Sequence, residues 1–586
     1  MQKKWVIIAI VAFVVFVGIM FVSVGIVFSA FRHSGSDIQE ESWLYLDISG
    51  SIVEYKRYKD DIFSGVTQAS VYDIEQCLRH AAADERIAGV VLSPRLGAIS
   101  GVGLTRIGSA IEFFKTSGKP VEAWLSSGSQ KDYWLATYAD RIHMIPTNSA
   151  SLLFTGVGGG SLFYTDALAK LGIKVHVFQV GDSKGAGEMF ERTSFSAAFR
   201  RNLSRLLDGY YESMLQALAD RRFDGDTTPV RRIYEERESL FITPAQALDW
   251  GLVDALLYGG EFLEELGITE EQLVDWDDYD PKLEIAWGDQ VAVIYAQGGI
   301  TSSSGLWGGN VITSADIDEI LDEIEDDQSV KAVVLRVDSP GGSAFVSERI
   351  FQRLKRMQQS KPLVVSMAGI AASGGYYISC GADSIFAEPF TITGSIGVVS
   401  MLPNLSGLAD DISLHSDTVS RGKFSDVFNV WRPLEAKLAS SLRTHGELVY
   451  EEFKTRVADG RDMTLTEVQE LAQGKLYTGR QAVDAGLVDA IGGLDDALDC
   501  AARLAGITQY RVESYPRRVS MFEEMLREGL KLQDRMQMAQ ARSLPADLDL
   551  WLHMLSEEHV LMLAPVASDV HWDARTDIWA LQKLLD

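Results

Sequence analysis

The segment with the clearest potential for chemistry is Ala371-Ala-Ser-Gly-Gly-Tyr-Tyr377, which follows a predicted strand. A serine on a tight turn from a strand into a helix, flanked by small residues, exposes its Oγ at the helix N-terminus. The free N–H groups and the helix dipole at that end favour a developing negative charge. Ser373 is therefore a candidate nucleophile, and the N–H of Gly374 is a candidate donor to an oxyanion.

A second glycine-rich turn, Asp338-Ser-Pro-Gly-Gly342, stands about thirty residues earlier and also follows a predicted strand. Because glycine lets the backbone approach a substrate carbonyl closely, this turn can present a second oxyanion donor. Taken alone, glycine pairs and serines are ordinary turn residues. The case for catalysis therefore depends on a comparison of this region with the rest of the chain.

A serine nucleophile also needs a base, and none of the nine histidines stands in a recognisable partner motif. A neutral lysine can serve instead. Lowering the pKa of a lysine from about 10.4 to about 7 costs about 5 kcal/mol of differential solvation, so the amine must be buried. Lys184 and Lys423 are the two candidates by position.

The sequence contains one block of about 240 residues twice. The segments Thr243–Ala255 and Thr478–Ala490 are identical at nine of thirteen positions. Upstream, the apolar run that ends at Leu92 aligns with the run that ends at Leu335. A repeat of this length is too long for a solenoid unit and predicts two tandem domains of one fold.

The two copies differ at the reactive positions. Where the second copy has its serine and glycines, the first has Ser129-Gln-Lys-Asp-Tyr133, and in place of the other glycine turn it has Ser93-Pro-Arg-Leu-Gly97. Since the fold is common to both copies, this difference points to a function that only the second copy retained.

Composition excludes several classes of protein. The 586 residues are 46% apolar, enough to fill two or three cores, and the net charge is −28. Such an acidic chain is not expected to bind nucleic acid, which requires clustered cations. Three scattered cysteines do not form a disulfide framework or a cysteine-based metal site. We expect neither a metal nor a cofactor.

Residues Trp5–Phe31 form an apolar run without a charged side chain, preceded by Lys3 and Lys4. A bilayer is spanned by about 20 apolar residues, whereas the apolar core of a cleaved signal peptide has about 7–15. We therefore expect an uncleaved anchor with a cytoplasmic N-terminus. This orientation places the rest of the chain on the periplasmic or outer side of the inner (cytoplasmic) membrane.

Short β-rich runs alternate with helical periods in each copy, which predicts an α/β fold of parallel βαβ units. Long helical stretches follow each sheet core, at 197–237 and 434–473. An amphipathic, Met-rich helix is expected at 520–540. In the second copy, strands are expected at 291–295, 331–337, 362–366 and 384–387, and helices at 314–326, 347–359 and 373–381.

Together the anchor, the repeat and both glycine turns resemble the long, membrane-anchored form of the signal peptide peptidase A (protease IV) family. The resemblance also includes Thr393-Gly-Ser-Ile-Gly397 and the context of Lys184 up to Arg192. It implies two tandem Clp-protease/crotonase-like (ββα spiral) domains. It also implies a Ser/Lys dyad whose serine comes from the second copy and whose lysine comes from the first.

By this resemblance Ser373 is the nucleophile, Lys184 the general base and Ser395 the hydroxyl that orients the lysine. Gly342 and Gly374 form the oxyanion hole. Short relatives of the family carry their catalytic lysine near the place of Lys423, which keeps that residue as the alternative lysine.

The expected organisation is an anchor at 1–32, a first repeat at 42–268, an acidic linker at 269–289, a second repeat at 290–510 and a helical tail at 511–586. The expected activity is that of a membrane-bound serine endopeptidase that degrades hydrophobic peptides, such as cleaved signal peptides or unfolded segments. The family further implies a homotetramer. Two alternatives are a catalytically silent membrane scaffold and a crotonase-type acyl-thioester enzyme, which needs no serine nucleophile.

Overall fold

The structure is a computed structural model that describes residues 38–56, 69–279, 281, 288–302, 311–425, 427–518 and 561–563. The expected anchor at 1–32 and the expected helix at 520–540 lie outside these ranges. None of the helices within them is both long enough and apolar enough to cross a bilayer.

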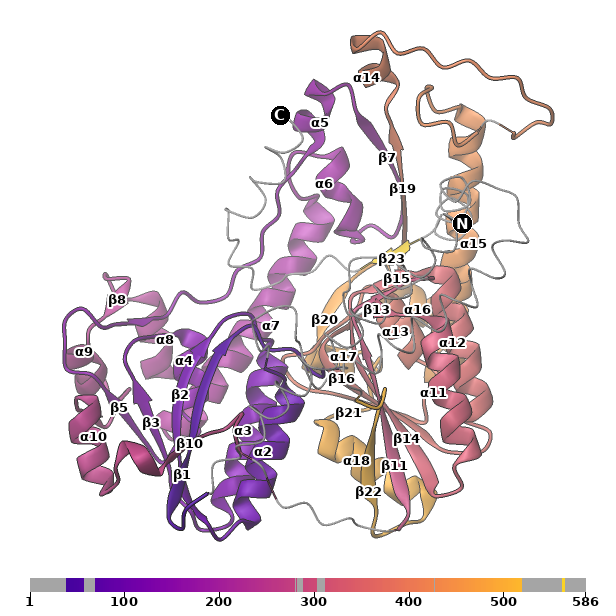
Figure 1. The fold of residues 1–586 in the computed structure, drawn as a ribbon. Coiled ribbons are helices and arrows are strands. Elements are labelled where there is room, and N and C mark those ends of the chain that lie inside the picture. Colours follow the sequence, from indigo (N-terminus) through magenta and orange to yellow (C-terminus); the bar gives the residue numbers. More distant parts are fainter. Residues whose placement is uncertain are drawn as a thin grey trace, which may run out of the picture.

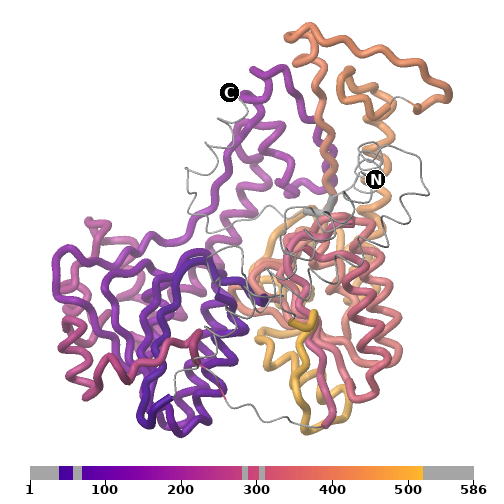
Figure 2. The backbone as a smooth tube through the Cα atoms, in the orientation of Figure 1, coloured from indigo at the N-terminus to yellow at the C-terminus, as the bar shows by residue number. Residues whose placement is uncertain are grey.

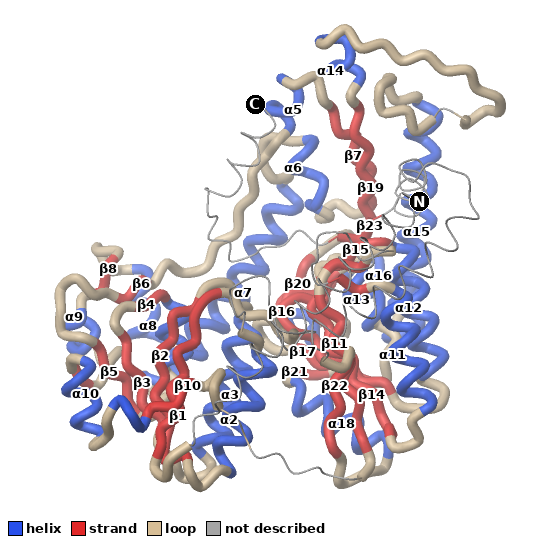
Figure 3. Tube along the Cα trace, viewed as in Figure 1, coloured by secondary structure: helices blue, strands red, loops and turns tan. Residues whose placement is uncertain are grey.

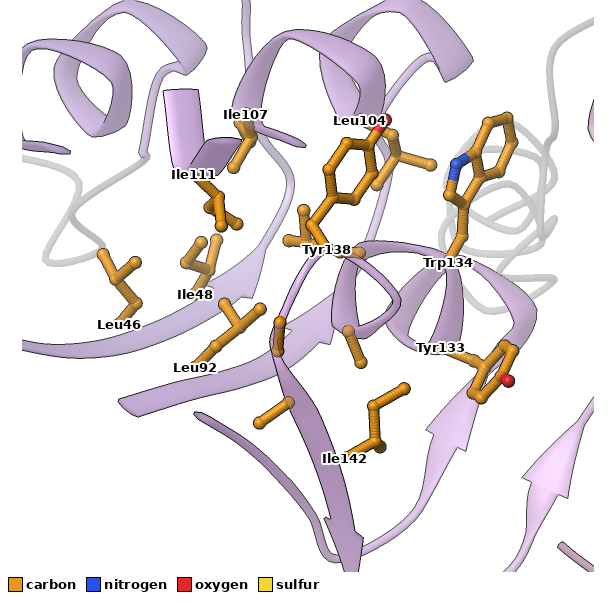
Figure 4. Packing of buried hydrophobic residues seen from close by; sticks show 14 of the residues in the cluster. Leu46, Ile48, Leu92, Leu104, Ile107, Ile111, Tyr133, Trp134, Tyr138 and Ile142 are labelled. Atoms are coloured by element: carbon orange, nitrogen blue, oxygen red, sulfur yellow. The ribbon is translucent and has the colours of Figure 1, made fainter. Parts of the chain in front are cut away.

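The first copy is built on a parallel sheet in which every strand pair runs in the same direction. Side chains of β1 (Ser42–Gly50) and β2 (Ile87–Leu96), among them Leu46, Ile48 and Leu92, lie in one buried cluster with Ile107 and Ile111 of helix α3 (Gly101–Lys115) (Figure 4). The strand order is β10 (Leu273–Asp275), β1 (Ser42–Gly50), β2 (Ile87–Leu96), β3 (Val121–Leu125), β5 (Arg141–Met144) and β9 (Ala255–Leu256). Its helices are α2 (Val71–Ala83), α3 (Gly101–Lys115), α4 (Gln130–Ala136), α9 (Pro244–Asp249) and α10 (Gly259–Leu266), with the 3-10 turn η2 (Glu270–Gln272).

The second copy repeats this plan around a larger sheet (Figure 1). Its central strands β11 (Gln290–Gln297), β14 (Val330–Ser339) and β16 (Leu363–Ala372) are buried along most of their length and mostly apolar, as expected for parallel strands covered by helices. The path is β20 (Leu476–Thr478), β18 (Ile392–Gly394), β16 (Leu363–Ala372), β14 (Val330–Ser339), β11 (Gln290–Gln297) and β22 (Arg511–Tyr515), with β17 (Ser384–Ala387) joining β16 to β21 (Ala490–Ile491). The helices are α11 (Ser314–Asp326), α12 (Ala344–Met357), α13 (Gly374–Ser379), α17 (Gly479–Asp484) and α18 (Leu494–Ala505).

Alternate residues of these strands face two different helical layers, because successive side chains of a strand point to opposite faces. Val333 and Leu335 pack in the cluster that contains α11 and α12, whereas Val334 and Val364 pack against α18. Figure 3 shows these helices on either side of the sheet.

Equivalent hydrogen bonds occur in both copies, at positions that also match in sequence. The hydroxyl of Tyr133 donates to the carbonyl of Leu252 at 2.9 Å, and the hydroxyl of Tyr376 donates to that of Leu487 at 2.9 Å. These contacts join equivalent helices and turns in the two units. The predicted α/β class with two tandem repeats is confirmed.

Two expected boundaries need correction. Residues Leu273–Asp275, placed in the acidic linker, form β10 and pair in parallel with β1. Residues Arg511–Tyr515, placed in a helical tail, form β22 and pair with β11. In both cases a short segment completes an open sheet edge, a contact that local sequence pattern does not reveal.

A third sheet combines strands of both copies. Strand β7 (Lys174–Val180) belongs to the first copy, yet it pairs antiparallel with β19 (Val398–Asn404) of the second along seven residue pairs. Figure 2 shows this crossing as a magenta strand beside an orange one. The order is β13 (Val311–Ile312), β12 (Gly299–Ile300), β15 (Gly341–Ser343), β23 (Leu561–Leu563), β19 and β7.

Long helices connect these sheets. Helix α7 (Ala197–Arg222) buries Phe199 and Leu206 against Leu476 of the second copy, and its other end buries Leu215 in the core of the first. Its counterpart is α15 (Ala436–Arg461). The remaining elements are α5 (Thr165–Lys170), η1 (Gly185–Gly187), α6 (Glu188–Glu191), α8 (Thr227–Glu235), α14 (Ser406–Asp411), α16 (Leu465–Leu471) and a small sheet of β4 (Gly128–Ser129), β6 (Leu152–Leu153) and β8 (Phe241–Ile242).

A buried charge cluster also joins the copies. Arg336 of β14 donates to Glu54 of the first copy at 2.7 Å, and Arg106 pairs with both Glu54 and Glu75. Burial acts to raise the pKa of Glu54, but Arg336 and Arg106 hold it below its ordinary value. The cluster fixes β14 at a point two residues before the Asp338–Gly342 turn begins.

Candidate active site

Ser373 occupies the turn between β16 and α13, as the sequence predicts. Its backbone has φ +56° and ψ −116°, a conformation that non-glycine residues rarely adopt. The turn is held because the N–H of Ser373 donates to the Gly394 carbonyl at 2.8 Å and the Tyr377 N–H donates to the Ser373 carbonyl at 2.9 Å. Strained serines of this kind are concentrated at functional sites.

Lys184 reaches this serine from the other copy. It follows β7, and its Nζ lies 2.7 Å from Ser373 Oγ. The same amine lies 2.8 Å from the carbonyl oxygen of Ser395 and 3.0 Å from Ser395 Oγ. The crossing strand pair of β7 with β19 delivers the lysine, because β19 begins three residues after Ser395.

Burial decides the protonation of this lysine. The side chain of Lys184 is 0% exposed, and burial holds its pKa well below the ordinary value of 10.5. Its oxygen contacts are a carbonyl and two hydroxyls, which do not compensate a positive charge as a carboxylate would. The site therefore favours a neutral amine that can accept a proton.

The glycine turn lies beside the serine. A Cβ on Gly342 would meet the Ile300 carbonyl oxygen at 2.0 Å, so only glycine fits in this strand. A Cβ on Gly374 would lie 3.1 Å from the Gly342 nitrogen and 2.7 Å from Ser347 Oγ. The amide groups of Gly342 and Gly374 therefore lie close together next to Ser373, at the positions where the sequence predicted the two oxyanion donors.

Lys423 is far less suited to catalysis. It is exposed, and its Nζ lies over the ring of Phe424 at 5.3 Å. At the place of the serine in the first copy, Gln130 begins α4 and its side-chain amide donates to the Gly156 carbonyl at 2.8 Å. The structure thus brings Lys184, Ser373, Ser395, Gly342 and Gly374 together and leaves Lys423 apart.

Two residues that shape the site escaped the sequence analysis. Gly474 has φ +73°, and a Cβ there would meet the backbone nitrogen of Lys184 at 2.5 Å. Only a glycine at this position therefore lets the backbone at Lys184 lie so close. The first copy has Ser239 at the aligned position, and this difference between the copies could have identified Gly474 from the sequence. Ser347, which is fully buried against Gly374, carried no comparable signal.

Comparison with known proteins identifies relatives over most of the chain. Peptidase family S49 matches residues 113–270 and 355–508. Protease 4 of Salmonella typhi is 32% identical over 536 residues, covering 85% of this chain and 84% of that protein. The chloroplastic serine protease SPPA of Arabidopsis thaliana is 30% identical over 496 residues, covering 81% of this chain and 71% of that protein.

A solved structure of a ClpP1 mutant from Listeria monocytogenes aligns with a TM-score of 0.24 and 14% identity, covering 35% of this chain and 94% of that chain. This likeness is too slight to support an argument. The sequence relatives are sufficient by themselves to define a class, the serine peptidases. Within that class, the chain belongs to peptidase family S49. Membership favours the peptidase over the scaffold and the acyl-thioester enzyme.

Proposed function

We propose that this peptidase uses a Ser373/Lys184 dyad to degrade hydrophobic peptides, such as signal peptides already released from their proteins. The observation that carries the proposal is the 2.7 Å contact between Lys184 Nζ and Ser373 Oγ in a fully buried site. The names of the relatives support peptide hydrolysis, and the family resemblance supports the substrate class.

In the proposed reaction, Ser373 Oγ attacks the scissile carbonyl carbon while its proton passes to Lys184 Nζ. The N–H groups of Gly342 and Gly374 stabilise the oxyanion. Collapse of the tetrahedral intermediate breaks the C–N bond, and Lys184 returns the proton to the leaving amine. Water then attacks the acyl ester with Lys184 as base, which restores the serine. Ser395 orients the amine throughout through its carbonyl and hydroxyl oxygens.

The dependence of activity on pH tests the lysine base. A protonated amine cannot accept the serine proton, so kcat/KM should rise about tenfold per pH unit below the pKa of Lys184 and then level off. Because burial lowers this pKa, the plateau should be reached well below pH 10.5. Initial rates on a fluorogenic peptide measure the profile. A flat profile from about pH 5 to 9, or a rise centred near the ordinary lysine value, contradicts the proposal.

We also propose that residues 1–32 anchor the chain in the inner (cytoplasmic) membrane with the peptidase on the periplasmic or outer side. The apolar run Trp5–Phe31 and the preceding Lys3 and Lys4 support this orientation. Substrates released within the same membrane would then be close to the enzyme.

The internal repeat supports a cyclic homotetramer. The segment of the first copy that carries Lys184 packs on the second copy through β7. The equivalent segment of the second copy, which carries Lys423, exposes Ile412 at 59%, Leu414 at 46% and Val419 at 89%. We propose that this segment packs on the first copy of the next chain, a head-to-tail contact that closes into a ring.

A chain without residues 1–32 should therefore be soluble and should have a tetramer's mass by light scattering. Val419→Asp should reduce it to monomers, because it places a charge in the proposed contact. Leu504→Asp, an equivalent change at a half-exposed residue on α18, should leave the tetramer intact. A stable, fully active monomer of the unmodified chain would refute the ring.

A further inference from the structure

A short segment of the second copy, Gln473–Leu476, contacts both halves of the active site, and we call it the joint segment. Within the second copy, one of its carbonyl groups accepts the N–H of Ser395 at 2.7 Å. Its last residue, Leu476, lies opposite Gly394 in the pairing of β18 with β20. The Gly394 carbonyl in turn accepts the N–H of Ser373 at 2.8 Å. The backbone at both serines therefore depends on the place of the joint segment.

The joint segment also contacts the part of the first copy that carries the base. The N–H of Ser183 donates to the Gln473 carbonyl at 2.8 Å, one residue before Lys184. The next residue, Gly474, packs directly on the backbone of Lys184, because it has no Cβ. The lysine, Ser395 and the turn of the nucleophile thus meet on one short piece of chain.

Burial is what lowers the pKa of Lys184. The charged side chains on the segments packed around it are engaged elsewhere or exposed. Lys475 Nζ donates to a main-chain carbonyl at 2.5 Å, a carboxylate oxygen of Glu188 accepts a main-chain N–H at 2.8 Å, and Asp182 is exposed. A looser joint segment would therefore act on the amine mainly by admitting water.

Asn202 of α7 holds the joint segment from the side of the first copy. Its side-chain amide donates to the Leu476 carbonyl at 3.0 Å, and the Leu476 N–H donates to its Oδ1 at 2.8 Å. We call this pair of hydrogen bonds the clamp. Asn202 is 7% exposed and Leu476 is 0% exposed. Loss of the amide would thus withdraw a partner from two buried main-chain groups or admit water to them.

The two copies differ at the clamp. Helices α7 and α15 both span 26 residues, and Ser441 of α15 occupies the place that Asn202 has in α7. The hydroxyl of Ser441 donates to the Lys437 carbonyl of its own helix at 2.9 Å. In the first copy, the residue aligned with Leu476 is Phe241, which is 54% exposed. The clamp therefore lies at the copy that retained the nucleophile.

We propose that Asn202 is a positioning residue of the active site, which acts through the joint segment to hold Ser395 and the backbone at Lys184 in place. The first copy then supplies a clamp as well as a base. This inference rests on the proposed Ser373/Lys184 dyad. When the clamp is lost, the joint segment loosens, the amine of Lys184 becomes more hydrated, and it keeps its proton to higher pH.

The test is Asn202→Ala in the full-length protein. We expect the midpoint of the profile of kcat/KM against pH to rise by about one pH unit, which makes kcat/KM about tenfold lower on the acidic limb. The loss should fall on kcat and leave KM nearly unchanged, because Asn202 acts on Leu476 rather than on the peptide. The rate at which a fluorophosphonate labels Ser373 should show the same shift.

Leu203→Ala is the matched control. Leu203 is the next residue of α7, is also 7% exposed and packs in the same apolar cluster as Leu476. This variant should lower the melting temperature, because it removes buried apolar contacts, but it should leave the pH midpoint in place. An equal shift of the midpoint in Leu203→Ala and Asn202→Ala would mean that the docking of α7 matters and the clamp does not, which overturns the proposal.

Asn202→Leu separates hydrogen bonding from packing, since leucine fills a similar volume without the amide. Its midpoint should shift as far as that of Asn202→Ala, and a midpoint equal to that of the unmodified protein contradicts the clamp. If Ser373 is labelled and the acidic limb is present while neither Asn202 variant moves the midpoint, the positioning role is wrong and the dyad stands. If Ser373→Ala retains full activity, the dyad fails, and the role of Asn202 fails with it.

Discussion

Replacing Ser373 by alanine is expected to reduce peptidase activity by about 10⁴-fold or more while the chain still folds. Removal of a nucleophile leaves only the catalysis that the oxyanion donors and substrate binding provide. The fold should persist because the turn is held by backbone hydrogen bonds of Ser373 rather than by its hydroxyl. Turnover of a fluorogenic peptide and the melting temperature are the two measurements.

Ser379→Ala is the matched control. Ser379 is also fully buried on α13, but its hydroxyl donates to the Gly375 carbonyl at 2.7 Å, within the helix. This variant should lose little activity. A serine-reactive fluorophosphonate followed by peptide mapping should label Ser373 in both the parent and the control, and nothing at that position in Ser373→Ala. Near-parental turnover by Ser373→Ala would falsify the mechanism.

The sequence analysis predicted the core elements well where a strand is apolar and bounded by turn residues. The strand expected at 331–337 is β14, which extends from Val330 to Ser339, and the helix expected at 314–326 is α11. Such buried parallel strands carry a strong local signal. The short edge strands β10 and β22 carry almost none, because their pairing depends on partners far away in the chain.

The same distinction applies to the site. The turn at Ser373 could be predicted from its neighbours in the sequence, because a tight turn from a strand into a helix requires small residues beside the serine. The contact of Ser373 with Lys184 could not, because 189 positions separate them and β7 must first cross to the second copy. Spacing left Lys184 and Lys423 equally eligible, and only the family resemblance ranked them before the geometry did.

Burial of the lysine amine is also a property of the assembled copies. The amine of Lys184 comes from the first copy, whereas its three oxygen contacts, Ser373 Oγ and the carbonyl and hydroxyl oxygens of Ser395, come from the second. Gly474 contributes because, without a Cβ, it lets the backbone at Lys184 pack closely against the second copy. The burial that lowers the pKa of Lys184 therefore depends on contacts between the copies, and the proposed dyad requires both copies.

The two lysines should differ sharply when each is replaced by alanine. Lys184→Ala removes the only amine in contact with Ser373 Oγ among the described residues and should lower kcat/KM by about 10³-fold or more. Lys184→Met, which keeps the volume of the side chain, should be equally inactive if proton transfer rather than packing is lost. Lys423→Ala should retain most of the turnover, because Lys423 is exposed beside Phe424.

These rates are to be measured together with the assembly state of each variant, so that any effect of Lys423→Ala on the proposed tetramer is separated from an effect on chemistry. If each tetramer contains four sites formed from Ser373 and Lys184, fluorophosphonate labelling should reach one equivalent per chain in both the parent and Lys423→Ala. The reverse ranking, with Lys423→Ala inactive and Lys184→Ala active, would mean that each copy uses its own lysine. In that case the crossing of β7 would serve to hold the copies together and would not supply the base.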